Sequence, residues 1–191
     1  MIINRTHPAP SVRSDLVRTG IRIFGHVGFG IGLREIAAEA GVTAGSVTYH
    51  FGGKAGLRSA CDRQVLDDTR VHLPMVVSSG EREVRLRGNS RTHLHNLRYL
   101  MRSLAESTAL VEPLIDLLLE STRTEVLAHY QTDQPDPDEV DAAATRVIRR
   151  ALGVAMLDHA LAAPHTAEDL RVQLTAWRDI ARGILESDRS E

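Results

Sequence analysis

Residues 33–57 read LREIAAEAGVTAGSVTYHFGGKAGL, and this stretch decides the fold. From Leu33 to Ala40 the apolar residues recur at the spacing i, i+3, i+4, i+7, which places them on one face of a short helix. Gly41 then ends that helix, and Thr43 is a suitable N-cap for a second short helix of about eight residues. Two short helices joined by a three-residue turn predict a helix-turn-helix.

Helices this short do not persist alone in water, so the unit needs a third helix as a lid. Residues 11–26 supply one, because Ser11 is a helix cap and an apolar stripe follows it. The expected core of the three helices is Leu16, Phe24, Ile36, Val42, Val47 and Phe51. The second short helix then presents small and polar residues to solvent, and its N-terminus points unpaired N–H groups outward, as suits a phosphate.

The segment resembles the DNA-binding motif of the tetracycline-repressor (TetR) family. The residues that carry the resemblance are LREIAAEAGV at 33–42, Gly45, the triplet Tyr49-His50-Phe51, Lys54 and Leu57, with Phe24 and Gly28 upstream. The resemblance covers about residues 12–58. It implies an all-α fold, with a three-helix N-terminal DNA-binding domain and a C-terminal helical bundle that binds a ligand and dimerises.

The resemblance also assigns roles along the recognition helix. Thr43, Tyr49 and Lys54 would contact phosphates, His50 would contact the DNA backbone, and base edges would lie nearest Ala44, Gly45, Ser46 and Thr48. Two positions depart from the family pattern. Gly32 stands where a capping threonine is common, and Thr48 where an aromatic residue is common. Both departures remove frequent contacts, so base readout is expected to depend more on Ser46, Thr48 and DNA shape.

The remaining sequence is read as helices packed on one another. The expected domains are a flexible arm at 1–10, the DNA-binding domain at 11–58, and a regulatory and dimerisation domain at 59–191. Helices are expected at about 54–73, ending at Pro74, and at about 92–107, 108–130, 140–161 and 170–184. The segment 74–91 has no clear pattern. The resemblance assigns ligand binding to this half, and the candidate cavity residues are Leu66, Met101, Leu104, Leu117 and Glu120.

The last two helices show alternating four- and three-residue apolar steps, the spacing of a packed helical seam. Such a seam either closes the core of one protomer or joins two protomers. The dimer is preferred here because the resembled family dimerises through its last two helices, and because two recognition helices read a palindrome. The expected interface residues are Val147, Ala151, Val154, Leu174, Trp177 and Ala181, with Trp177 as the anchor.

Composition narrows the function classes. The 191-residue chain has a net charge of −2, divided between a net +4 over residues 1–58 and −6 over the rest. A basic N-terminal piece on an acidic body modestly favours a polyanion as partner. Its apolar runs are too short to cross a bilayer, and the single cysteine, Cys61, excludes a disulfide within the chain. A cytoplasmic protein with no metal and no cofactor is expected.

The sequence and the resemblance together predict a homodimeric regulator, and not an enzyme, that binds a palindromic operator. Its release by a small-molecule effector is what the resemblance alone implies. No phosphate-binding loop, nucleophile elbow or paired-carboxylate motif supports an enzyme. Activation in place of repression stays open. The alternative is a helical interaction or adaptor protein whose helix-turn-helix is a relic that does not bind DNA.

Overall fold

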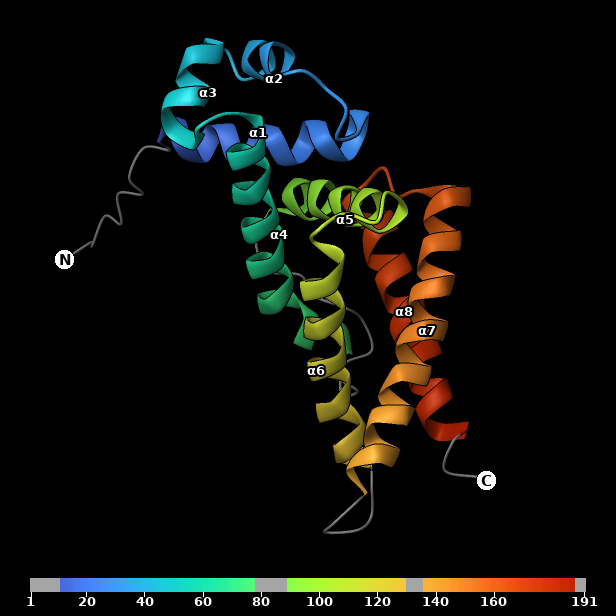
Figure 1. The fold of residues 1–191 in the computed structure, drawn as a ribbon. Helices are drawn as coiled ribbons and strands as arrows, with labels where there is room; N and C mark the ends of the chain where they lie inside the picture. The colour runs from blue at the N-terminus through green and yellow to red at the C-terminus, as the bar shows by residue number, and fades with distance from the viewer. Residues whose placement is uncertain (1–10, 78–88, 130–135, 188–191) are drawn as a thin grey trace, which may run out of the picture.

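The computed structural model describes residues 11–77, 89–129 and 136–187, and all regular structure in these ranges is α-helical (Figure 1). The expected all-α fold is confirmed, while the expected arm at 1–10 lies outside the described residues. The helices are α1 (Val12–Val27), α2 (Leu33–Glu39), α3 (Ala44–Phe51), α4 (Lys54–Val77), α5 (Ser90–Ala105), α6 (Val111–His129), α7 (Pro137–Ala162) and α8 (Ala167–Ser187). In the described part of the chain, none of these helices has the length and apolar character needed to cross a membrane.

Helices α1, α2 and α3 form a unit at one end of the molecule, as Figure 1 shows. The side chain of Ser11 caps α1 by accepting a hydrogen bond from the backbone N–H of Ser14 at 3.2 Å. At the N-terminus of α2, Gly32 has no side chain to offer, but its N–H donates to Glu35 Oε2 at 3.0 Å. Gly41 adopts φ +67°, a left-handed conformation that favours glycine, and this turn directs the chain into α3.

The core beneath this unit is continuous with the rest of the protein. Leu16, Phe24, Ile36 and Val47 are fully buried, whereas the predicted core residues Val42 and Phe51 are only partly buried at its edge. The same cluster includes Leu57, Ala60, Cys61 and Val65 of α4, and Tyr99 of α5. A division between residues 58 and 59 therefore falls inside α4 and inside one apolar core.

Helices α4 to α8 form the body below this unit (Figure 1). Helix α4 runs from the α1–α3 unit down into the body and ends at Val77, three residues beyond the predicted end at Pro74. A proline removes its own N–H bond to the preceding turn and leaves the other bonds of the last turn available, so this helix continues past it. Helices α7 and α8 lie side by side as an antiparallel pair, as the break around Pro164 predicts.

Candidate nucleic-acid interface and effector cavity

Helix α3 is built from the N-cap that the sequence predicts. The hydroxyl of Thr43 accepts the backbone N–H of Ser46 at 3.2 Å and lies 3.2 Å from the Ser46 hydroxyl. The Thr48 hydroxyl donates to the Ala44 carbonyl at 3.1 Å. Ser46 and Thr48 are therefore engaged along their own helix, and each hydroxyl retains lone pairs for a further partner.

One face of α3 is open to solvent. Tyr49 is 86% exposed, and Thr43, Gly45 and Thr48 are also exposed, whereas Ala44, Ser46 and His50 are partly buried. Val47 is fully buried and anchors the opposite face in the core. The helix is thus a short rod fixed to the protein by one side, with its other side available to a partner.

Positive charge lies at the C-terminal end of this rod. Lys54 begins α4, and the guanidinium of Arg13 at the start of α1 lies 5.1 Å from the centre of the Phe51 ring. That spacing suits a cation–π contact, which keeps the charge of Arg13 beside the end of α3. Arg13 is not among the residues that the sequence predicts for this site. Its position in the first turn of residues 11–26, the helix expected to cover the helix-turn-helix, could have indicated it.

Tight backbone packing fixes α3 against α4. Gly52 and Gly53 both have positive φ, at +71° and +124°, and they make the turn between the two helices. A Cβ on Gly56 would lie 1.8 Å from the carbonyl oxygen of Phe51, so no other residue fits there without moving one helix. The position of α3 is consequently set by the first turn of α4.

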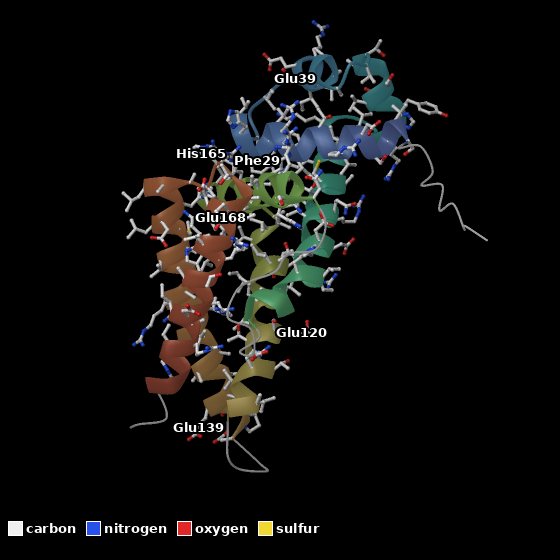
Figure 2. All side chains as sticks on the ribbon, turned by 180° about the vertical axis from the view of Figure 1, so that it is seen from behind. Phe29, Glu39, Glu120, Glu139, His165 and Glu168 are labelled. Atoms are coloured by element: carbon white, nitrogen blue, oxygen red, sulfur yellow. The ribbon has the colours of Figure 1, made fainter. Side chains whose placement is uncertain are left out.

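Helix α1 lies directly on the helices of the body. A Cβ on Gly25 would lie 2.9 Å from the backbone nitrogen of Tyr99, which marks a close crossing of α1 and α5. The Tyr99 ring packs edge-on against Phe24 and Phe29, and its hydroxyl donates to Asp62 Oδ1 at 2.6 Å. Figure 2 shows Phe29 at this junction between the α1–α3 unit and the body. Movements of α4 or α5 therefore reach α1 directly.

The outer rim of the unit is held by polar contacts. Arg22 on α1 donates to Glu39 Oε2 on α2 at 2.8 Å, and Figure 2 shows Glu39 at the outer end of the molecule. Both side chains are largely exposed, so this ion pair contributes little stability, and its effect is to orient α2 on α1.

A cavity of about 240 Å³ lies inside the body. Every helix from α4 to α8 contributes to its wall, which is mostly leucine, other aliphatic residues and Trp177. Its polar wall residues are Asp68, Thr69, His72, His93, Asn96, Thr122 and Arg178. A partly open apolar space with a few polar groups has the character of a small-molecule site.

The structure separates the residues suggested for ligand binding. Met101 and Leu104 line the cavity, as expected. Leu66 packs instead against the core under the α1–α3 unit, and Leu117 is buried outside the cavity wall. Glu120 is exposed on α6, and Figure 2 shows it at the side of the body. The face of α6 that meets the cavity carries Leu114, Leu118 and Thr122, which the sequence reading did not select.

The residues suggested for the dimer interface face the interior of the protomer. Val147 and Trp177 are buried at 3% and 8% exposure, and the Trp177 Nε1–H donates to Asp158 Oδ2 at 2.9 Å. The cavity wall includes Val147, Ala151, Leu174, Trp177 and Ala181, while Val154 packs against the cluster of Leu94, Leu97 and Met101. The seam thus closes one protomer, which is the alternative that the spacing left open.

A different face of the α7–α8 pair is exposed and apolar. On α7, Leu157 is 59% exposed and Leu161 77%, with Met156 nearby, and on α8 Val172 is 59% exposed. Gly153, Ala160 and Ala176 are exposed small residues of the same two helices. Large apolar side chains left in water at this density commonly mark an interaction surface.

Sequence comparison with known proteins finds matches in the N-terminal part of the chain. The sequence profile described as "Bacterial regulatory proteins, tetR family" matches residues 16–61. Over 50 residues the chain is 56% identical to the HTH-type transcriptional regulatory protein RaaS of Mycobacterium tuberculosis, covering 26% of this chain and 24% of that protein. It is 33% identical over 66 residues to the HTH-type transcriptional dual regulator CecR of Shigella flexneri, covering 32% and 30%. The matches thus span about a quarter to a third of these curated relatives.

Solved structures match over nearly the whole chain. SCO4454, a TetR-family transcriptional regulator from Streptomyces coelicolor, superposes with a TM-score of 0.62 at 21% identity over 92% of this chain and 95% of that one. A TetR-family transcriptional regulator from Rhodococcus sp. gives 0.56 at 16% identity over 89% and 97%. These matches confirm the fold, a helix-turn-helix followed by a helical C-terminal region. Residues 16–61 therefore match the TetR family of bacterial regulatory proteins, and the chain as a whole shares the fold of solved TetR-family structures.

Proposed function

We propose that this protein is a transcription regulator that binds a palindromic DNA operator as a homodimer and leaves it when a small molecule enters the cavity. The observation that carries the proposal is α3, a capped helix anchored through Val47 and exposed along its other face. A major groove admits one such helix, and two copies one helical turn apart, about 34–36 Å, would read the two half-sites.

The contacts proposed on DNA divide into two kinds. Thr43, Tyr49 and Lys54 would bind phosphates, with His50 at the backbone, and Arg13 joins them because it lies at the same end of α3. Base edges would meet Ala44, Gly45, Ser46 and Thr48 near the helix N-terminus, the same residues that the family resemblance implies. Short side chains let the helix backbone approach the groove closely, which favours readout of DNA shape together with a few hydroxyl contacts.

Binding is tested by fluorescence anisotropy of labelled DNA from upstream of the protein's own gene, over a salt series. A regulator should lose affinity steeply as salt rises and should prefer one palindrome. Lys54→Ala should weaken binding to all sequences alike and reduce the salt slope by about 1. Arg63→Ala is the matched control, because Arg63 is exposed on the same helix, roughly 13 Å farther from the DNA end. An adaptor with a relic motif would show neither salt dependence nor sequence preference.

The homodimer is proposed to form through the exposed apolar face of α7 and α8. Leu157, Leu161 and Val172 would be buried between two protomers, and Gly153 and Ala160 would let the helices approach closely. This proposal replaces the interface suggested from the sequence, whose residues already pack inside one protomer.

Sedimentation velocity of two charge variants tests the interface. Leu157→Glu would bury an unpaired carboxylate between the protomers, so it should shift the protein to monomer at micromolar concentration. Leu127→Glu is the control, since Leu127 is 48% exposed but lies on α6. A Leu157→Glu protein that stays dimeric would move the interface to another face.

Release by an effector is proposed to act through α4. Asp68, Thr69 and His72 in the lower half of α4 line the cavity, and Lys54 at its start belongs to the DNA-binding end. A ligand that fits the cavity in only one position of α4 would shift the distance between the two copies of α3. We propose that the protein is cytoplasmic and that its binding to the operator represses transcription. Reporter expression with the gene deleted would show repression as a rise and activation as a fall.

A further inference from the structure

One residue of the cavity wall has a buried polar atom that the described part of the protein leaves without a partner. Asn96 of α5 is 6% exposed and lines the cavity, and its Oδ1 has no hydrogen-bond partner among the described residues. A buried acceptor left in this state costs free energy, which a ligand that donates a hydrogen bond would recover.

The orientation of this amide is fixed by α4. The Asn96 Nδ2 donates to Asp68 Oδ2 at 2.8 Å, and the other oxygen of Asp68 accepts from Gln64 Nε2 at 2.9 Å. Rotating the amide would place its oxygen against the Asp68 carboxylate, where two acceptors repel each other. Asn96 therefore offers an acceptor away from Asp68 and cannot offer a donor there.

The charges in the cavity wall already have partners. The Asp68 carboxylate receives two amide N–H groups, and the Arg178 guanidinium binds Asp179 Oδ1 through Nη2 and Nε at 2.9 and 3.1 Å. The rest of the wall is aliphatic, apart from Trp177 and a few polar groups. An ionic ligand would lose its hydration against this wall, so a neutral one is favoured.

We propose that the effector of this protein is a neutral, mainly apolar molecule with one N–H or O–H group that donates to Asn96 Oδ1. This inference rests on the proposed function for the cavity and adds the class of ligand. The volume of about 240 Å³ sets the size. A cavity of about 150 Å³ takes up benzene, so this one suits a bicyclic body of roughly ten non-hydrogen atoms.

Indole and benzofuran form the test pair, because they share shape and size but differ in whether the ring carries an N–H donor or an ether oxygen. Isothermal titration calorimetry of the full-length protein should show indole binding about tenfold more tightly than benzofuran. In Asn96→Leu the two affinities should agree within about twofold, since the acceptor is gone. Equal affinities in the unaltered protein would overturn the proposal and place the Asn96 oxygen toward the smaller pocket between α1 and α5, which it also borders.

A second variant tests the orientation without altering the buried amide. Asp68→Asn removes the carboxylate that fixes Asn96, so the preference for indole should fall, while Asp67→Asn, the same change at an exposed neighbour, should retain it. An unchanged preference in Asp68→Asn would contradict the fixed acceptor. Because these titrations contain no DNA, a preference for indole supports the ligand class even if operator binding fails, and operator binding without uptake of either probe refutes the ligand class alone.

Discussion

Replacement of Gly20 by alanine, alone and with Cys61→Ala, tests how α1 is seated on α4. Gly20 lies in the buried middle of α1, where an added Cβ would be 2.8 Å from the Cys61 Sγ. That is closer than the 3.5–4.0 Å of a normal contact. Gly20→Ala gains about 1 kcal/mol of helix propensity but incurs an overpacking cost of about 1–3 kcal/mol. We expect the single variant to lose about 1 kcal/mol of stability.

Cys61→Ala alone removes a fully buried sulfur and leaves a small void. Its loss should be about 1–2 kcal/mol, from the apolar burial that disappears and the space left behind. In the double variant the new methyl group occupies the place of the sulfur, so the overpacking and the void cancel each other. The double variant should match the unaltered protein within about 1 kcal/mol, which corresponds to a coupling of about −2 kcal/mol.

Urea unfolding followed by circular dichroism at one fixed protein concentration measures all four proteins, because the stability of a dimer depends on concentration. The control cycle pairs Cys61→Ala with Gly183→Ala on α8, where an added Cβ meets nothing within 4 Å. These two changes should be additive within about 0.5 kcal/mol. Additivity in the Gly20 cycle as well would refute the close packing of α1 on α4.

Three further results are expected. Trp177→Ala should reduce the free energy of unfolding by about 3–5 kcal/mol while the folded protein still sediments as a dimer, because Trp177 packs within its protomer; a stable monomer would contradict this. Burial, and after it nearby arginines, lowers the pKa of His95 and of His159 in the folded protein. Below about pH 6.5 the unfolded chain therefore binds more protons than the folded one, and the Tm should fall between pH 7.5 and pH 5.5. The fall in Tm should be smaller in His159→Gln. Burial, with Asp62 beside it, raises the pKa of the Cys61 thiol, so a thiol reagent should react with it only after denaturant is added.

The sequence predicts the helix-turn-helix well because its signals are local. Thr43 caps α3, Gly41 turns the chain before it, and Val47 faces inward, each through chemistry within a few residues. Arg13 could not be predicted in the same way, because its neighbour Phe51 is 38 positions away along the chain. The contact depends on how α1 crosses α3, and periodicity within one helix contains no information on crossing angles.

The residues predicted for the dimer interface lie on the inner face of α7 and α8 for a related reason. Helix α7 is apolar on two faces, with Val147 and Ala151 on the inner one and Leu157 and Leu161 on the outer one. A four- and three-residue repeat identifies a seam but does not say whether the partner is in the same chain. The cavity posed the same difficulty, since Leu117 and Leu118 are adjacent in sequence and only Leu118 meets the cavity.

The inner seam of α7 and α8 has a functional consequence because it forms the cavity wall. Residues such as Val147 and Trp177 pack in the protomer core and also border the cavity, so a ligand there presses on the same two helices that carry the proposed dimer face. On the opposite wall, Asp68 lies on α4, the helix that begins at Lys54 beside the recognition helix. In the proposed function a ligand would separate α4 from the α7–α8 pair, and this displacement would alter the distance between the two copies of α3 in the proposed dimer. Coupling between the cavity and DNA then requires only that α4 move as a rigid helix, with Asp62–Tyr99 and Gly20–Cys61 transmitting its position to α5 and α1.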